Sequence, residues 1–153
     1  MFRTLMIGAV SVAALTMAAS AYSQQAKLGT ADEAKAMLEK AVAAVQADKA
    51  KALASFNAGT DGFKDRDLQP FCFTKVDGKL VASTVPSLVG TDVKALKDKA
   101  GKVFGEEVFK AAIEGKITEV RYMFPRPGET EPVQKVSFVT AVGDLGCGVG
   151  YHP

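Results

Sequence analysis

The feature that most constrains the fold is a segment with a single apolar stripe, which starts at Thr30 and ends near Gly59. Thr30 and Glu33 have the spacing of a capping box, in which each side chain accepts a hydrogen bond from the backbone N–H of the other residue. Gly59 suits the left-handed conformation that ends many helices. We therefore expect one helix of about 27 residues, about 40 Å long, that runs along the whole domain. The apolar residues recur mostly every three or four positions and are Ala34, Leu38, Val42, Val45, Ala52 and Phe56.

After this helix, short strand-like segments alternate with turn residues. Asp77-Gly78 predicts a tight hairpin turn with two positive-φ positions. A single helical turn is expected at 92–96, and a second helix at 103–114, closed by Gly115. The pattern predicts an α+β domain with an antiparallel sheet and a helical segment inserted between the second and third strands. The expected strands are 71–76, 79–84, 117–124, 133–142 and 147–151.

The first 23 residues have the pattern of an export signal. Arg3 is followed by an apolar stretch of about ten residues, and small residues with A-x-A spacing close the segment. We expect cleavage after Ala21 or Ser23, which leaves one domain over 24–153. An uncleaved anchor is the alternative, but a spanning helix needs about 20 mostly apolar residues. We therefore expect a free periplasmic protein that does not span the membrane after cleavage.

Two cysteines, Cys72 and Cys147, would then lie in an oxidising compartment. A disulfide between them would close a long loop and stabilise the fold by about 4 kcal/mol. Two buried free thiols are the alternative. The chain has no C-x-x-C motif, which argues against a redox enzyme.

Several common types of functional site are not indicated. The chain has 19 basic and 17 acidic side chains, so no strong positive field favours nucleic acid as a partner. His152 is the only histidine and lies one residue from the end, where chains often fray. The glycine-rich run 146–150 fits a strand with close packing better than a phosphate loop. Asp61, Asp65 and Asp67 fit a solvated turn better than a calcium loop. We expect no catalytic residues, metal ligands or cofactor.

Three basic residues are more informative. Lys135 lies within an otherwise apolar and β-branched strand, and Arg121 and Arg126 flank the aromatic residues Tyr122 and Phe124. Cations beside aromatic walls can hold a small carboxylate, because charge-assisted hydrogen bonds orient it and the rings cover its apolar part. The alternative is a solvated strand face on which long side chains reach water.

The order of several motifs resembles the single Cache domains of bacterial extracytoplasmic sensors. The matching segments of the first half are 67–73, 77–79 and 86–92, and those of the second half are 122–128, 135–139 and 148–151. The resemblance covers about residues 28 to 151. It implies a long N-terminal helix packed on a five-stranded antiparallel sheet in the order 2-1-5-4-3. In that order the strands of Cys72 and Cys147 are neighbours, which favours the disulfide.

The resemblance also implies a binding pocket for a small molecule. By position, its residues here are Tyr122, Phe124, Lys135 and Phe138, with Arg121 and Arg126 beside them. Phe124 replaces a residue that is often Trp in the family, and Phe138 one that is often Tyr. Both changes remove a hydrogen-bond donor, so the ligand of a relative cannot be transferred to this chain.

The sequence thus predicts a stand-alone Cache-type domain and not an enzyme. It would bind a carboxylate or amino-acid-like metabolite and act in signal sensing, as in chemotaxis, through a membrane receptor or histidine kinase. Lys135 would pair with the ligand carboxylate. The alternative is a ligand-free interaction module, either a dimer or an accessory subunit of a membrane sensor.

Overall fold

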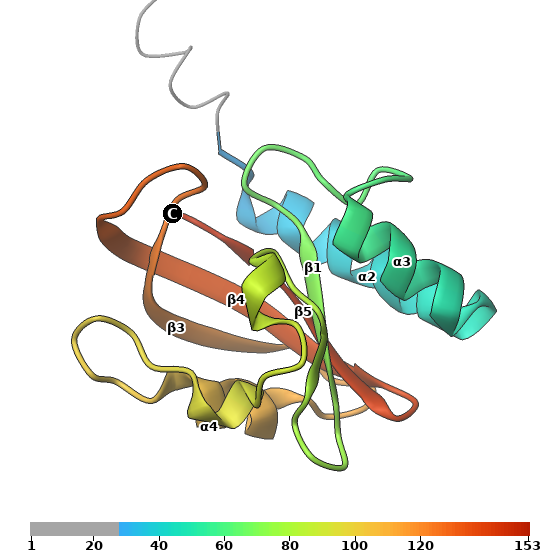
Figure 1. The fold of residues 1–153 in the computed structure, drawn as a ribbon. Helices are drawn as coiled ribbons and strands as arrows, with labels where there is room; N and C mark the ends of the chain where they lie inside the picture. The colour runs from blue at the N-terminus through green and yellow to red at the C-terminus, as the bar shows by residue number, and fades with distance from the viewer. Residues whose placement is uncertain (1–27) are drawn as a thin grey trace, which may run out of the picture.

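The computed structural model of the chain describes residues 28–153, and the predicted export signal lies outside them. Five antiparallel strands form one sheet in the order β2-β1-β5-β4-β3, and helices lie on both of its faces (Figure 1). The predicted fold class and strand order are confirmed. The strands are β1 (Pro70–Thr74), β2 (Leu80–Ala82), β3 (Thr118–Pro125), β4 (Pro132–Val142) and β5 (Leu145–Tyr151).

The ends of the predicted long helix are correct. Helix α2 (Ala31–Ala47) starts with the expected capping box, in which the Glu33 N–H donates to the Thr30 hydroxyl and the Thr30 N–H donates to the Glu33 carboxylate. Helix α3 (Lys49–Ala58) ends at Gly59, whose φ of 66° is left-handed. In the described part of the chain, no helix is both long and apolar enough to cross a membrane.

The prediction of one continuous helix is wrong, because the helix is interrupted at Asp48. This residue is extended, with φ −158° and ψ 99°, and its carboxylate accepts a hydrogen bond from the Lys51 N–H. An aspartate in this position satisfies a free N–H at the start of a new helix. Helix α3 consequently runs back alongside α2 (Figure 1), so the two form a hairpin on one face of the sheet.

The hairpin between β1 and β2 is present but has a longer turn than expected. Of the two predicted positive-φ positions, only Gly78 has one, at 80°. The Asp77 carboxylate instead accepts hydrogen bonds from the Thr74 hydroxyl and the Lys79 N–H. A side-chain hydrogen bond of this kind replaces part of the backbone pairing of a two-residue turn.

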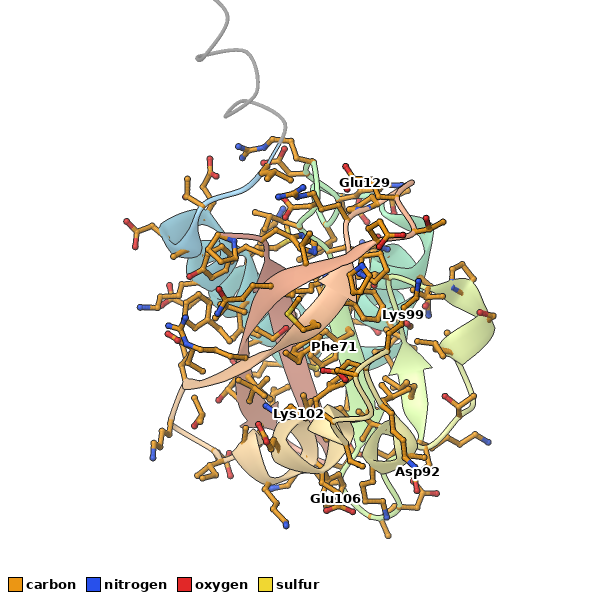
Figure 2. All side chains as sticks on the ribbon, turned by 90° about the vertical axis from the view of Figure 1, so that its left-hand side faces the viewer. Phe71, Asp92, Lys99, Lys102, Glu106 and Glu129 are labelled. Carbon is orange, nitrogen blue, oxygen red and sulfur yellow. A yellow bond between two sulfur atoms is a disulfide. The ribbon has the colours of Figure 1, made fainter. Side chains whose placement is uncertain are left out.

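The segment between β2 and β3 covers the other face of the sheet. It contains the 3₁₀ turns η1 (Pro86–Leu88) and η2 (Val93–Ala95) and helix α4 (Phe104–Ala111). Helix α4 ends before the predicted Gly115. Lys99 and Lys102 hold the segment against the β3 side of the sheet, because their ammonium groups donate to the Thr130 and Arg121 carbonyls (Figure 2).

The sheet therefore has two buried faces. The helix face packs against α2 and α3, and it includes Cys72, Phe138, Cys147 and Val149. The pocket face packs against η2 and α4, and it includes Phe73, Val120, Tyr122 and Val139.

Alternate residues of β5 on the pocket face are glycines, which confirms the prediction of a closely packed strand. A Cβ on Gly146 would collide with the Phe73 ring, and one on Gly148 would lie 2.5 Å from the Phe71 ring. A Cβ on Gly150 would collide with the side chain of Lys135. The missing Cβ atoms leave space in which these long side chains lie flat across the centre of the sheet.

Cys72 and Cys147 form a disulfide, as the resemblance implied. The two residues are directly opposite each other in the β1–β5 pairing and are fully buried on the helix face. The bond links positions 75 residues apart in sequence.

Candidate ligand-binding site

A small apolar cavity lies between the pocket face and the inserted segment. Its volume is about 40 Å³, which corresponds to about three water-sized positions. The Phe104 and Tyr122 rings stack with centroids 4.1 Å apart, and Phe124 meets Tyr122 edge to face at 6.2 Å. The cavity is lined by Phe71, Leu80, Ser83, Thr84, Leu88, Val93, Leu96, Phe104, Val108, Tyr122, Phe124 and Lys135.

The side chain of Tyr122 lines this cavity and carries no charge. Its hydroxyl forms a 2.8 Å hydrogen bond with the Ser137 hydroxyl on the neighbouring strand. Burial raises the pKa of Tyr122 to about 12, so the hydroxyl stays protonated at neutral pH.

Lys135 is the buried cation of the site. It lies directly opposite Tyr122 in the β3–β4 pairing, and only 6% of its surface is exposed. Its aliphatic stem crosses Gly150, and its Nζ lies 4.9 Å from the centroid of the Phe124 ring. Within residues 28–153, no acidic side chain forms an ion pair with Nζ and no group hydrogen-bonds to it. Burial lowers the pKa of Lys135 to about 8, against a smaller opposing effect of the Asp67 carboxylate.

A larger outer cavity of about 410 Å³ adjoins the apolar one and shares Thr84, Phe124 and Lys135 with it. In Figure 2, Phe71, which lines the apolar cavity, lies near the middle of the domain, and Glu129, which lines the outer cavity, lies at its upper end. The outer cavity is lined by Lys64, Arg66, Asp67, Gln69, Thr84, Val85, Pro86, Phe124, Pro125, Arg126, Pro127, Gly128, Glu129 and Lys135.

The two arginines of the outer cavity differ in how far they are neutralised. Arg66 donates to the carboxylates of Glu33 and Asp65 at 2.7 and 2.8 Å, and these contacts lower the pKa of both acids. Among residues 28–153, Arg126 forms one ion pair, with Glu129 at 3.7 Å. The Nε of Arg126 is buried and has no hydrogen-bond partner among the described residues. Arg126 is therefore the less satisfied of the two cations.

Asp67, which lines the outer cavity, forms a buried pair with His152. The Asp67 carboxylate accepts hydrogen bonds from the Gly29 N–H at 2.5 Å and the His152 N–H at 3.1 Å, and it lies 2.9 Å from the His152 Nδ1. These hydrogen bonds keep the pKa of Asp67 low, although its burial acts in the opposite direction. The expectations of a solvated Asp67 and a frayed His152 are wrong, since the residues are 6% and 2% exposed.

The structure brings together four of the six predicted site residues. Tyr122, Phe124 and Lys135 line the apolar cavity, and Arg126 lines the outer one. Phe138 lies on the helix face, where its ring stacks on Tyr151 at 5.7 Å and lies under the Lys35 ammonium.

Arg121 also lies outside the site. Its side chain is exposed and paired with Glu119 on the same strand. Since side chains alternate along a strand, the positions on either side of Tyr122 point away from the cavity.

Sequence reasoning missed the residues that come from the inserted segment and from β1. Phe71, Ser83, Thr84 and Phe104 all line the apolar cavity. The alternation of glycine in β5 was a usable signal for Phe71, because Gly148 leaves space for its ring. Nothing in the local pattern of the other three residues indicates that they lie opposite Lys135.

Solved structures of bacterial sensor domains have the same fold. A methyl-accepting chemotaxis protein from Vibrio parahaemolyticus is 19% identical over 79% of this chain and 86% of its own, with a TM-score of 0.62. A periplasmic sensor domain of a chemotaxis protein is 26% identical over 79% and 88%, with a TM-score of 0.56. A Cache chemosensory domain, solved to explain carboxylic acid recognition, is 18% identical over 90% and 99%, with a TM-score of 0.61.

No curated protein matches the sequence. The Cache domain family, in contrast, matches residues 8–152, which is nearly the whole chain. Together with the sheet order and the cavity between the sheet and the inserted segment, this match shows that the chain belongs to the Cache domain family.

Proposed function

We propose that this chain is a periplasmic sensing domain that binds a small carboxylic acid and reports its presence through a partner protein. The observation that carries the proposal is the position of Lys135, a buried cation without an acidic partner in the described structure, where an apolar cavity meets a larger polar one. The solved Cache domain with carboxylic acid recognition and the chemotaxis sensor that is 26% identical support the sensing role.

A carboxylate suits Lys135 for a physical reason. A buried ammonium group without a counter-ion has lost its hydration, and few interactions with the protein compensate that loss. A bound carboxylate would supply the missing charge and a charge-assisted hydrogen bond, which is worth about 1.5 to 3 kcal/mol. The Phe124 ring, 4.9 Å from Nζ, would cover the apolar part next to the carboxylate.

The cavity volumes favour a short acid. About three heavy atoms fit into the 40 Å³ next to Tyr122 and Phe104. A longer tail can only extend into the 410 Å³ outer cavity, where charged side chains surround it. We therefore propose acids with tails of about one to three carbons.

A calorimetric titration with acetate, propionate, butyrate and hexanoate tests this proposal. We expect the three short acids to bind and hexanoate to bind at least tenfold more weakly. Propionamide has the same shape as propionate without the charge, and it should not bind measurably. Equal affinities of propionate and propionamide would contradict a role for the charge of Lys135.

The same titration should depend on pH with a defined sign. The carboxylate binds the protonated form of Lys135, and burial lowers the pKa of that amine to about 8 in the free protein. Affinity should therefore be constant from pH 6 to about 7.5 and fall by up to tenfold per pH unit above about 8. An unchanged affinity at pH 9.5 would exclude Lys135 as the counter-ion.

A ligand-free interaction module remains the alternative. In such a protein Lys135, which has no acidic partner in the described part of the chain, would have no role in binding, and no acid in the series would bind. Light scattering would then be expected to show a dimer that persists on dilution.

A further inference from the structure

We propose that the free edge of β3 pairs with the same edge of a second copy of this chain, so that the two sheets join into one continuous antiparallel sheet. The two strands would meet about a two-fold axis at Val120, and Glu119 of each copy would lie opposite Arg121 of the other. This inference goes beyond the proposed function, since neither charged residue lines the two cavities of the candidate site.

Strand β3 forms one edge of the sheet (Figure 1). The Lys75 N–H donates to the Asp144 carbonyl, which extends the β1–β5 pairing by one hydrogen-bonded pair. Such pairs alternate along antiparallel strands, so the register can be followed across β5 and β4 to β3. It places the outward backbone groups of β3 on residues 119, 121 and 123. The Arg121 carbonyl accordingly accepts a hydrogen bond from the Lys102 ammonium group, which lies outside the sheet.

The side chains at this edge carry a self-complementary pattern of charge. Glu119 is opposite Phe138 in the β3–β4 pairing and therefore lies on the helix face, as does Arg121 two positions further on. Helix α2 packs over β5, β4 and β1, and both charged residues are exposed. Within one copy they form an ion pair. The two-fold pairing would join two such ion pairs into a square of alternating charges, in which each carboxylate has a guanidinium group on two sides.

The charges also select one register. A pairing centred on residue 119 would place two glutamates directly opposite each other, and one centred on residue 121 would place two arginines there. Like charges directly across a strand pair are destabilising, whereas opposite charges stabilise it. The register centred on Val120 is the one between these two, and it brings only opposite charges together.

The same register pairs two exposed apolar side chains. It places Ile117, which directly precedes β3, opposite Met123 of the second copy, and these residues are 39% and 38% exposed. Ile117 also lines a groove of about 440 Å³ beside α2, together with Leu38 and Val42. A methionine side chain is flexible enough to fill an irregular groove of this kind. The apolar contact and the charge contact thus point to the same partner, a second copy of this chain.

The expected dimer is weak, because each copy contributes little more than one strand edge. We expect a Kd on the order of 100 μM, as for small transient interfaces. Lys102 does not prevent the pairing, since a carbonyl oxygen has two lone pairs and can accept a second hydrogen bond. The Lys102 ammonium group also has its own acidic partner, Glu107, at 3.2 Å.

Sedimentation equilibrium of the protein up to about 1 mM, at low salt, tests the proposal. Arg121→Glu and Glu119→Arg each place like charges across the pairing, and each should raise the Kd about tenfold or more. Lys75→Glu is the matched control, because it makes the same change of charge as Arg121→Glu on the exposed β1–β2 turn. Its Kd should stay within about twofold of that of the unaltered protein.

Charge exchange separates a specific pairing from a general effect of charge. The double variant Glu119→Arg/Arg121→Glu keeps the net charge and restores opposite charges across the pairing, so it should dimerise like the unaltered protein. A mixture of the two single variants should form a heterodimer, which native mass spectrometry resolves by mass. Recovery of dimers in both experiments also shows that the single variants fold.

A protein that stays monomeric at about 1 mM would overturn the proposal, as would a dimer that neither single variant weakens. A double variant that remains monomeric would exclude the register centred on Val120. Calorimetry with propionate separates this inference from the proposed function, because Arg121→Glu should leave propionate affinity unchanged. A monomer that binds propionate would remove only the dimer, and a dimer that binds no acid would remove only the proposed function.

Discussion

Lys135→Met should stabilise the protein by about 3 kcal/mol at pH 7 and weaken the binding of propionate at least tenfold. The expected gain follows from the pKa of Lys135, which burial lowers from 10.5 to about 8. Each pKa unit corresponds to about 1.4 kcal/mol of free energy between the two protonation states. Methionine has a similar length and shape, so it removes the charge without leaving a large void.

The pH dependence of this gain has a definite sign. Between pH 8 and 10.5 the unfolded chain keeps a proton on Lys135 that the folded protein has lost, so the stability of the unaltered protein rises with pH. The advantage of Lys135→Met should therefore be largest below pH 8 and decrease to a small packing difference near pH 10.5. Urea unfolding at pH 7, 8.5 and 10 measures this difference.

Lys75→Met is a suitable control, because Lys75 is exposed on the β1–β2 turn. This variant should change the free energy of unfolding by no more than about 0.5 kcal/mol, and it should leave propionate binding unchanged. If Lys135→Met destabilises the protein at pH 7, the buried ammonium group has a partner that compensates its burial. A stable Lys135→Met with unchanged propionate binding would instead show that the ligand binds elsewhere.

The double variant Cys72→Ala/Cys147→Ala should lose about 4 kcal/mol of unfolding free energy. The disulfide joins positions 75 residues apart, and opening a loop of this size increases the entropy of the unfolded chain by about that amount. Both sulfur atoms are fully buried against α2, so the variant also loses packing on the helix face. Urea unfolding with and without dithiothreitol is the appropriate measurement.

The reductant provides an internal control for this prediction. Dithiothreitol should destabilise the unaltered protein once it has reduced the bond during unfolding, and it should have no effect on the double variant. Because the disulfide lies on the helix face, opposite the cavities, propionate affinity should be unchanged in the folded variant at 15 °C. A loss below about 1 kcal/mol would show that strain or residual structure in the unfolded chain cancels the effect of the cross-link.

The sequence by itself determined the elements that depend on local interactions. The capping box at Thr30, the helix end at Gly59 and the order of the five strands along the chain could all be inferred from neighbouring residues. The break at Asp48 was missed although it is also local, because the apolar stripe continues across it. A side-chain cap is worth about 1 kcal/mol, which was enough here to end one helix and start another.

The pairing of β1 with β5 came from the family resemblance rather than from any pattern in the chain. Strand alternation shows that a strand has two faces, but it does not show which strand lies beside it when the two are far apart in sequence. The neighbours Cys72 and Cys147 are 75 residues apart, and their disulfide was inferred only through the implied strand order.

Only the tertiary structure decided which face of the sheet carries the site. The resemblance implied that Lys135 and Phe138 share one pocket, but they lie on opposite faces of β4. Both faces of this strand are buried, so its pattern did not indicate which face α2 would cover. The same holds for Asp67 and His152, which are polar in sequence but become buried because the start of β1 lies beside the end of β5. A cavity forms where segments distant in sequence meet. The free energy of packing these segments together depends on residues that are far apart in the chain, and no local sequence pattern links them.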